Sequence, residues 1–167
     1  MKLAHIIATG LALAIAAPAV AQTSRNAQID YPGFERLTRD VSGLRQKRLI
    51  DFGRFRAMAA KSDTLILDAR SRDAYARGHI AGAVNLPFTD FTDESLAEVI
   101  GANRGRPILI YCNNNFSNNM APVRLKARPL ALNIQTFINL VGYGYANVWE
   151  LDEVIDFNDP KVGWVKG

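Results

Sequence analysis

Two short runs dominated by apolar residues constrain the fold of this chain more than any other feature. They are Thr64–Leu67 and Ile108–Tyr111. A run in which successive residues, rather than every second one, are apolar is typical of a strand buried on both faces of a parallel sheet. Helical patterns alternate with such runs, and parallel strands need crossover connections. The sequence therefore predicts an α/β fold with a central, mostly parallel sheet and helices on both faces.

Caps, breakers and spacing predict the other elements. Asp51 and Ser71 are expected N-caps, and Gly78 is expected to end the helix that follows Ser71. Helices are expected at 52–60, 72–77, 95–101, within 117–127 and at 130–141. Further strands are expected at 48–50 on an edge of the sheet, at 83–86 and at 147–149. The remaining polar residues, up to Gly167, carry no clear pattern.

The only cysteine, Cys112, directly follows the second apolar run and precedes the polar loop Asn113–Ser117. Open α/β sheets place their ligands at the carboxyl ends of strands. A sulfur at that position faces the first N–H groups of the loop and the positive end of the next helix dipole, and both favour the thiolate. A free cysteine is also among the residues most often buried. Position and loop composition favour a reactive thiol over a structural one.

The amino terminus predicts export. Lys2 precedes the apolar stretch 6–17, and Ala19-Val20-Ala21 fits the small-residue pattern of a cleavage site. Residues 1–21 are therefore interpreted as a signal peptide, with an uncleaved anchor as the alternative. The interpretation predicts a periplasmic or secreted protein without stable membrane insertion after cleavage. Residues 22–46 are expected to form a loosely ordered arm, or a tail packed on the surface of a domain at 47–167.

Charge and cysteine content narrow the function classes. The formal net charge is +4, and one of the positive charges, Lys2, lies in the signal segment. So small a surplus, without a basic stripe interleaved with aromatic residues, argues against nucleic-acid binding. A single cysteine excludes an internal disulfide. In an oxidising compartment such a thiol is catalytic, paired with another molecule or buried.

Two segments resemble the rhodanese family of sulfurtransferases and their relatives. Gly144–Leu151 is similar to the carboxyl-side signature of that family, although Asp152-Glu153 then stand where the family usually has paired glycines. The resemblance covers about residues 47–155 and implies a rhodanese-like three-layer fold with Cys112 as the persulfide-forming cysteine. The residues similar to the amino-side signature are Leu65–Ser71, Ala74-Tyr75, Gly78-His79-Ile80, Gly82-Ala83, Asn85 and Pro87.

The resemblance also assigns the loop after the cysteine to the persulfide and substrate. In this family the N–H groups of a tight loop stabilise the anion, so no metal and no cofactor is implied. Asn115 stands at the usual glycine and tolerates a left-handed backbone, whereas Ser117 replaces the arginine or threonine of many relatives. Phosphatase relatives need an arginine where this chain has Asn118, which argues against phosphoryl transfer. The expected persulfide- or substrate-binding residues are Asn113, Asn114, Asn115, Phe116 and Ser117.

An insertion near 118–129 separates Cys112 from the last signature by more residues than the family usually has. It carries Arg124, Lys126 and Arg128. These basic residues are expected to attract an anionic sulfur donor if the insertion folds over the loop. The alternative is a solvated face on the outer surface.

The leading hypothesis is a sulfurtransferase that passes sulfane sulfur from a small anionic donor such as thiosulfate to a thiol acceptor through a persulfide on Cys112. One alternative is an inactive rhodanese-like module that binds or regulates a protein partner. Another is a redox sensor in which Cys112 pairs with a partner's thiol. Structural roles are expected for Asp68, Arg70 and His79, since charges near a core are normally paired.

Overall fold

The computed structural model describes residues 26–167, and the signal peptide predicted for residues 1–21 lies outside this range. Pro32–Gly167 form one compact unit. No helix within the described range is long and apolar enough to cross a membrane.

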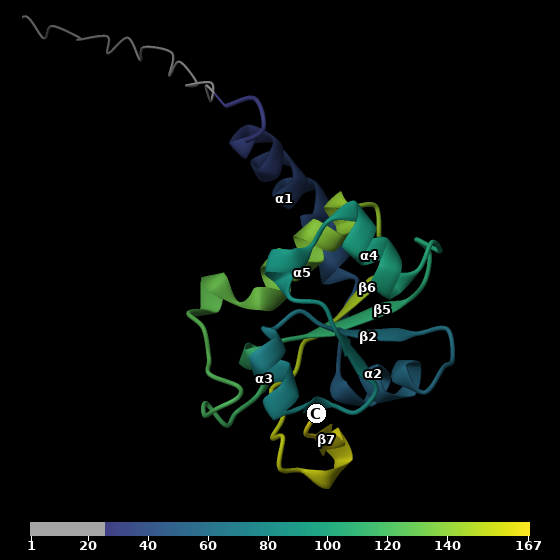
Figure 1. Cartoon of the computed structure of the whole chain (residues 1–167), viewed down its shortest axis with the longest axis vertical. Coiled ribbons are helices and arrows are strands. Elements are labelled where there is room, and N and C mark those ends of the chain that lie inside the picture. Colours follow the sequence, from purple (N-terminus) through teal and green to yellow (C-terminus); the bar gives the residue numbers. More distant parts are fainter. Residues whose placement is uncertain (1–25) are drawn as a thin grey trace, which may run out of the picture. The chain divides into compact units, whose positions relative to one another are not determined.

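Five strands form a parallel sheet in the order β1-β6-β5-β2-β4, and a separate antiparallel pair joins β3 to β7 (Figure 1). The strands are β1 (Leu49–Ile50), β2 (Leu65–Asp68), β3 (His79–Ile80), β4 (Ala83–Asn85), β5 (Ile108–Tyr111), β6 (Val148–Leu151) and β7 (Trp164–Val165). The α-helices are α1 (Tyr31–Gln46), α2 (Phe52–Ala59), α3 (Arg72–Arg77), α4 (Asp93–Ile100) and α5 (Leu132–Gly142). The 3₁₀ helices are η1 (Phe88–Asp90), η2 (Asn113–Asn115), η3 (Arg128–Leu130) and η4 (Pro160–Val162).

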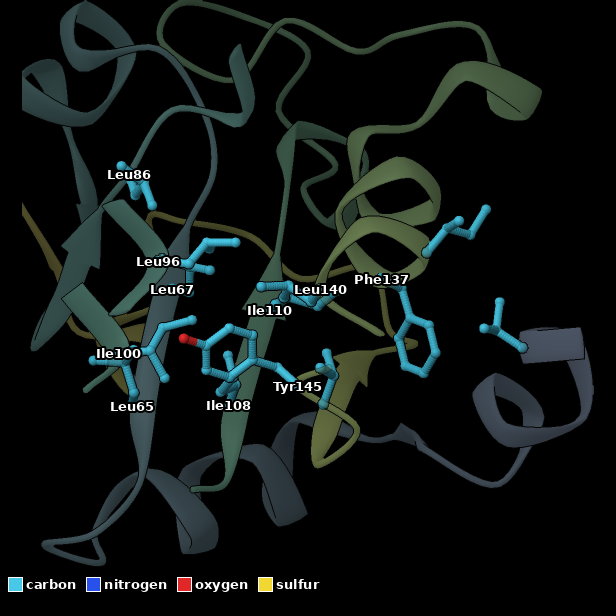
Figure 2. Packing of buried hydrophobic residues seen from close by; sticks show 13 residues of the cluster. Leu65, Leu67, Leu86, Leu96, Ile100, Ile108, Ile110, Phe137, Leu140 and Tyr145 are labelled. Carbon is cyan, nitrogen blue, oxygen red and sulfur yellow. The ribbon is translucent and has the colours of Figure 1, made fainter. Parts of the chain in front are cut away.

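The sheet separates two apolar clusters, as the buried strands predict. Alternate residues of β2 and β5 point to opposite faces, so Leu67 and Ile110 pack on one side while Ile66 and Leu109 pack on the other. The first cluster joins the sheet to α1, α4 and α5 (Figure 2). The second joins it to α2, β3 and the segment that ends in η4, with Tyr75 of α3 packed against it. The predicted α/β fold, with helices on both faces of a parallel sheet, is confirmed.

Local caps act as the sequence predicts. Asp51 accepts a hydrogen bond from the N–H of Arg54, and Ser71 accepts one from the N–H of Ala74. Gly78 ends α3, where an added Cβ would lie 2.3 Å from the indole nitrogen of Trp164. Glycine is required there because β7 packs directly against this turn. The β1, β2, β4, β5 and β6 strands and the α2, α3, α4 and α5 helices match their predicted places within a few residues.

From Tyr31 on, the expected arm forms α1, and Leu37, Val41 and Leu44 pack this helix against the first cluster, as the alternative of a packed tail predicts. One expectation is wrong. No helix forms within 117–127, where the backbone makes turns and extended segments instead. The carboxyl-terminal stretch, which shows no clear sequence pattern, forms η4 and β7.

A buried ionic network closes the carboxyl end of β2. The Asp68 carboxylate is fully buried and accepts hydrogen bonds from Arg70 Nε at 2.9 Å, Arg70 Nη2 at 2.6 Å and the Tyr111 hydroxyl at 2.6 Å. The same Arg70 Nη2 donates to the Gly78 carbonyl oxygen at 2.7 Å. Burial, followed by the charge of Asp68, raises the pKa of Tyr111 well above its ordinary value. The structural roles expected for Asp68 and Arg70 agree with this network.

Replacing Asp68 tests the importance of this network for stability. Asp68→Asn leaves the buried Arg70 guanidinium without a counter-charge, so the free energy of unfolding in urea should fall by about 3–5 kcal/mol. The exposed pair Arg77–Asp73 provides the control, and Asp73→Asn should cost less than about 1 kcal/mol. Equal losses in the two variants would contradict the argument.

Candidate active site

Cys112 lies at the carboxyl end of β5, the central strand of the sheet, and its side chain is 1% exposed. The residue caps η2, and its Sγ accepts a hydrogen bond from the N–H of Asn114 at 3.4 Å. The strand fixes the position of the sulfur, because β2 and β6 flank β5 along its length. This is the edge of the sheet where ligands bind in open α/β folds.

The first turn of α5 also faces the sulfur. Burial raises the pKa of the Cys112 thiol above its ordinary value. The backbone N–H groups of Asn133, Asn114 and Leu132 act in the opposite direction and lower this pKa. The charge of Glu150 adds a smaller upward effect. Two of these three donors belong to the amino terminus of α5, where unpaired N–H groups and the helix dipole favour an anion. Burial has the largest effect, so the pKa of the thiol lies above its ordinary value.

The loop amides reach other acceptors instead of the sulfur. The N–H of Asn115 donates to the Cys112 carbonyl, that of Phe116 to the Asn113 carbonyl, and that of Ser117 to the Ile155 carbonyl. Among the five described residues Asn113–Ser117, only Asn114 donates from its backbone to Sγ. Leu132 and Asn133, which sequence analysis did not single out, supply the other donors. From the sequence, the positive end of the next helix dipole is expected to face the sulfur, and that of α5 does so. This helix begins at Leu132, later in the chain than the helix expected within 117–127.

Asn115 ties the site together through its side chain, which is 6% exposed. Its Oδ1 accepts from the N–H of Cys112 and from Asn133 Nδ2, both at 2.9 Å. Its Nδ2 donates to the carbonyl oxygens of Leu151 at 2.7 Å and Glu153 at 3.1 Å. One amide therefore joins the end of β5, the end of β6 and the first turn of α5.

Asn113 and Asn114 hold the insertion beside the loop. Asn113 Nδ2 donates to the Arg124 carbonyl at 2.8 Å. Asn114 makes two bonds to the backbone of Lys126, donating to its carbonyl at 2.8 Å and accepting from its N–H at 3.0 Å. The insertion thus lies next to the cysteine loop, while the side chains of Arg124, Lys126 and Arg128 are exposed.

Phe116 and Ser117 connect the loop to the far end of the chain. The Phe116 ring is 1% exposed and contacts Trp164 edge to face, with ring centroids 5.1 Å apart. Ser117 Oγ donates to the Ile155 carbonyl at 3.4 Å. Both side chains hold the backbone of the loop against the segment that leads to β7.

A cleft of about 340 Å³ lies beside the cysteine loop. Asn114, Asn115 and Asn133 line it, and so does Glu150, which is 3% exposed. Glu150 forms two hydrogen bonds of 2.6 Å with the guanidinium of Arg45, and this pairing raises the pKa of Arg45. The cleft is therefore polar. Three of the residues that line it, Asn114, Asn133 and Glu150, also affect the pKa of the Cys112 thiol.

His79 packs against Tyr75 in the described part of the chain. His79 stacks on Tyr75 with ring centroids 3.7 Å apart, and its Nδ1 lies 2.9 Å from the Tyr75 carbonyl. Residues 26–167 contain no group of three or more histidine, cysteine, aspartate or glutamate side chains arranged to hold a metal ion.

Comparison with known proteins identifies the fold. Residues 51–155 match the family described as Rhodanese-like domain. The rhodanese-like domain of the Alr3790 protein from Anabaena sp. has 20% sequence identity and a TM-score of 0.50, with 72% of this chain and 80% of that chain covered. A thiosulfate sulfurtransferase from Pseudomonas aeruginosa has 25% identity and a TM-score of 0.49, with coverage of 71% of this chain and 20% of that one. No curated protein sequence matches the chain.

Removing the Asn115 amide should loosen the whole site. Asn115→Ala leaves the N–H of Cys112 and the carbonyls of Leu151 and Glu153 without their partner, so the free energy of unfolding should fall by about 2–4 kcal/mol in urea. Asn158→Ala, an exposed asparagine, serves as the control and should change stability by less than about 0.5 kcal/mol. A loss for Asn115→Ala no larger than the control's would refute the tethering role.

The raised pKa of Cys112 predicts a specific pH dependence. The rate of alkylation by iodoacetamide should rise with a midpoint above the value of about 8.5 for a free thiol, and unfolding in urea should return the midpoint to that value. Because the folded state binds the proton more tightly, stability should be full below about pH 8.5 and decline as pH rises through the folded-state pKa. Cys112→Ser should abolish that decline. A native midpoint below the free-thiol value would show that the donors around Sγ outweigh burial.

Proposed function

We propose that this chain, which belongs to the rhodanese-like domain family, is a sulfurtransferase that carries sulfane sulfur on Cys112. The observation that carries the proposal is the position of Cys112 at the carboxyl end of β5, where the N–H of Asn114 donates to Sγ and the first turn of α5 lowers the pKa of the thiol. Such donors stabilise an anionic sulfur without a metal or a side-chain base. No other cysteine is present in the chain to serve as nucleophile.

The transfer has two steps. The Cys112 thiolate attacks the outer sulfur of thiosulfate, a new S–S bond forms, and sulfite leaves with the electron pair of the broken bond. An acceptor thiolate then attacks the outer sulfur of the persulfide and releases the Cys112 thiolate. Each step conserves charge and electrons and needs no external oxidant.

The closed thiol must open for the donor to reach it, since the side chain is 1% exposed. The insertion is the segment best suited to move, because Val123 is its only buried residue between Ser117 and Leu130. Its exposed Arg124, Lys126 and Arg128 would raise the local concentration of an anionic donor. The apolar amino terminus supports export, and we propose the periplasm as the compartment.

A non-catalytic binding module is the second candidate. Two observations favour it: burial raises the pKa of the Cys112 thiol, and the amides of Asn115, Phe116 and Ser117 are bound to carbonyl oxygens rather than to the sulfur. In that case Cys112 is a buried structural residue, and the surface of the insertion contacts a protein partner. The burial of Cys112 disfavours the third candidate, a sensor that pairs with a partner's thiol.

Mass spectrometry of the intact protein separates the first two candidates. Incubation with thiosulfate should add about 32 Da, the mass of one sulfur, and cyanide should remove it again. Cys112→Ser, the matched control, should show neither the adduct nor transfer to cyanide. An unmodified wild-type mass, together with transfer equal to that of Cys112→Ser, would favour the binding module.

A further inference from the structure

The cleft beside Cys112 is lined by both positively and negatively charged side chains that lack an ion-pair partner in the described residues. Arg45 and Glu150 neutralise one another through their two hydrogen bonds. Asp152 also lies close enough to Arg45 to raise the pKa of that guanidinium, so two carboxylates share one cation. One negative charge is therefore left in excess around Asp152, which is exposed.

Arg128 supplies the opposite charge from another segment. It belongs to η3, lines the same cleft and is exposed. Within residues 26–167 neither Arg128 nor Asp152 forms an ion pair, and they do not pair with each other. Glu153 also forms no ion pair there, but its Oε2 accepts from the N–H of Phe52 at 2.7 Å. The cleft thus offers one cation, Arg128, and one carboxylate, Asp152, whose side chain forms neither an ion pair nor a hydrogen bond within the described residues.

Asn133 connects the cleft to the sulfur. Asn133 lines the cleft and is 5% exposed, and its backbone N–H lowers the pKa of the Cys112 thiol. Its Oδ1 is buried and has no hydrogen-bond partner within the described chain. An unpaired buried acceptor is costly unless something donates to it. Asn133 therefore places an unpaired acceptor beside the cleft and a backbone donor beside the sulfur.

We propose that the cleft binds a small zwitterionic thiol, of the size and charge pattern of cysteine, as the sulfur acceptor, with its carboxylate at Arg128 and its ammonium group at Asp152. The volume of about 340 Å³ lies at the lower end of the range of ligand pockets and suits a small molecule. The proposal rests on the proposed sulfurtransferase function and names the acceptor for its second step. The acceptor thiolate attacks the outer sulfur of the Cys112 persulfide, the Cys112–S bond breaks, and the acceptor leaves as a persulfide.

Three acceptors test the charge pattern: cysteine, cysteamine, which lacks the carboxylate, and 3-mercaptopropionate, which lacks the ammonium group. Wild type and each variant are loaded with thiosulfate, the persulfide is verified by mass, and its decay is followed in a single turnover after each acceptor is added. Every variant rate is compared with the wild-type rate for the same acceptor, so differences in acceptor thiol pKa cancel.

Arg128→Gln should slow transfer to cysteine and to 3-mercaptopropionate by about fivefold and leave cysteamine unchanged. Asp152→Asn should slow transfer to cysteine and cysteamine by about fivefold and leave 3-mercaptopropionate unchanged or faster. The matched controls are Arg39→Gln on α1 and Asp63→Asn before β2, both exposed and outside the cleft, and they should change no rate. Variant effects that do not depend on the charge of the acceptor would overturn the proposal.

A second measurement tests ligand binding to the cleft independently of sulfur transfer. Serine, which carries a hydroxyl in place of the thiol, should shift the backbone amide resonances of Asn133 and Arg128 in a ¹H–¹⁵N titration, and both cleft variants should weaken the shifts. If no persulfide forms but serine binds, the sulfurtransferase function fails and the zwitterion site stands. If the persulfide forms and is transferred but serine does not bind, the zwitterion site fails and the sulfurtransferase function stands.

Discussion

The side chain of Asn115 is the interaction on which the site depends. Its carbonyl oxygen accepts from the cysteine N–H and from Asn133, while its amide nitrogen donates to the end of β6. A buried amide with all these partners is specific, because losing one segment leaves the others unsatisfied. Asn115 therefore joins the first turn of α5 to the end of β5, where Cys112 lies.

The groups that stabilise an anionic sulfur on Cys112 come from two segments, the loop and the first turn of α5. A loop whose own amides point at the sulfur surrounds it with donors from one segment, but here three loop amides are bound to carbonyl oxygens and helix α5 supplies donors from a distant part of the chain. The first turn of α5 thus supplies part of the anion stabilisation that the loop amides do not. Burial and the helix terminus act in opposite directions on the pKa of Cys112, and burial has the larger effect.

Local signals in the sequence were sufficient wherever a short-range interaction decides the structure. Asp51 and Ser71 cap their helices because the acceptor and the donor are three residues apart, and β2 and β5 are recognisable because both faces are buried. The insertion was not predictable in this way. Its conformation depends on side-chain amides that reach backbone groups 11 or 12 residues away, and asparagine carries no periodic signal. β7 was missed for a similar reason, since two residues pair with a strand far earlier in the chain.

The segments around Cys112 differ in how firmly they are held. The insertion is held mainly by hydrogen bonds from Asn113 and Asn114 at exposed positions, and such bonds open at a fraction of the global free energy of unfolding. The Asn115 amide is buried between strands and should open only with the sheet. Under the proposed function, a donor reaches Cys112 only when part of its surroundings moves, and water that enters with the donor weakens the desolvation that raises the pKa of the thiol. Access of the donor and a lower pKa of the thiol would then occur in the same state.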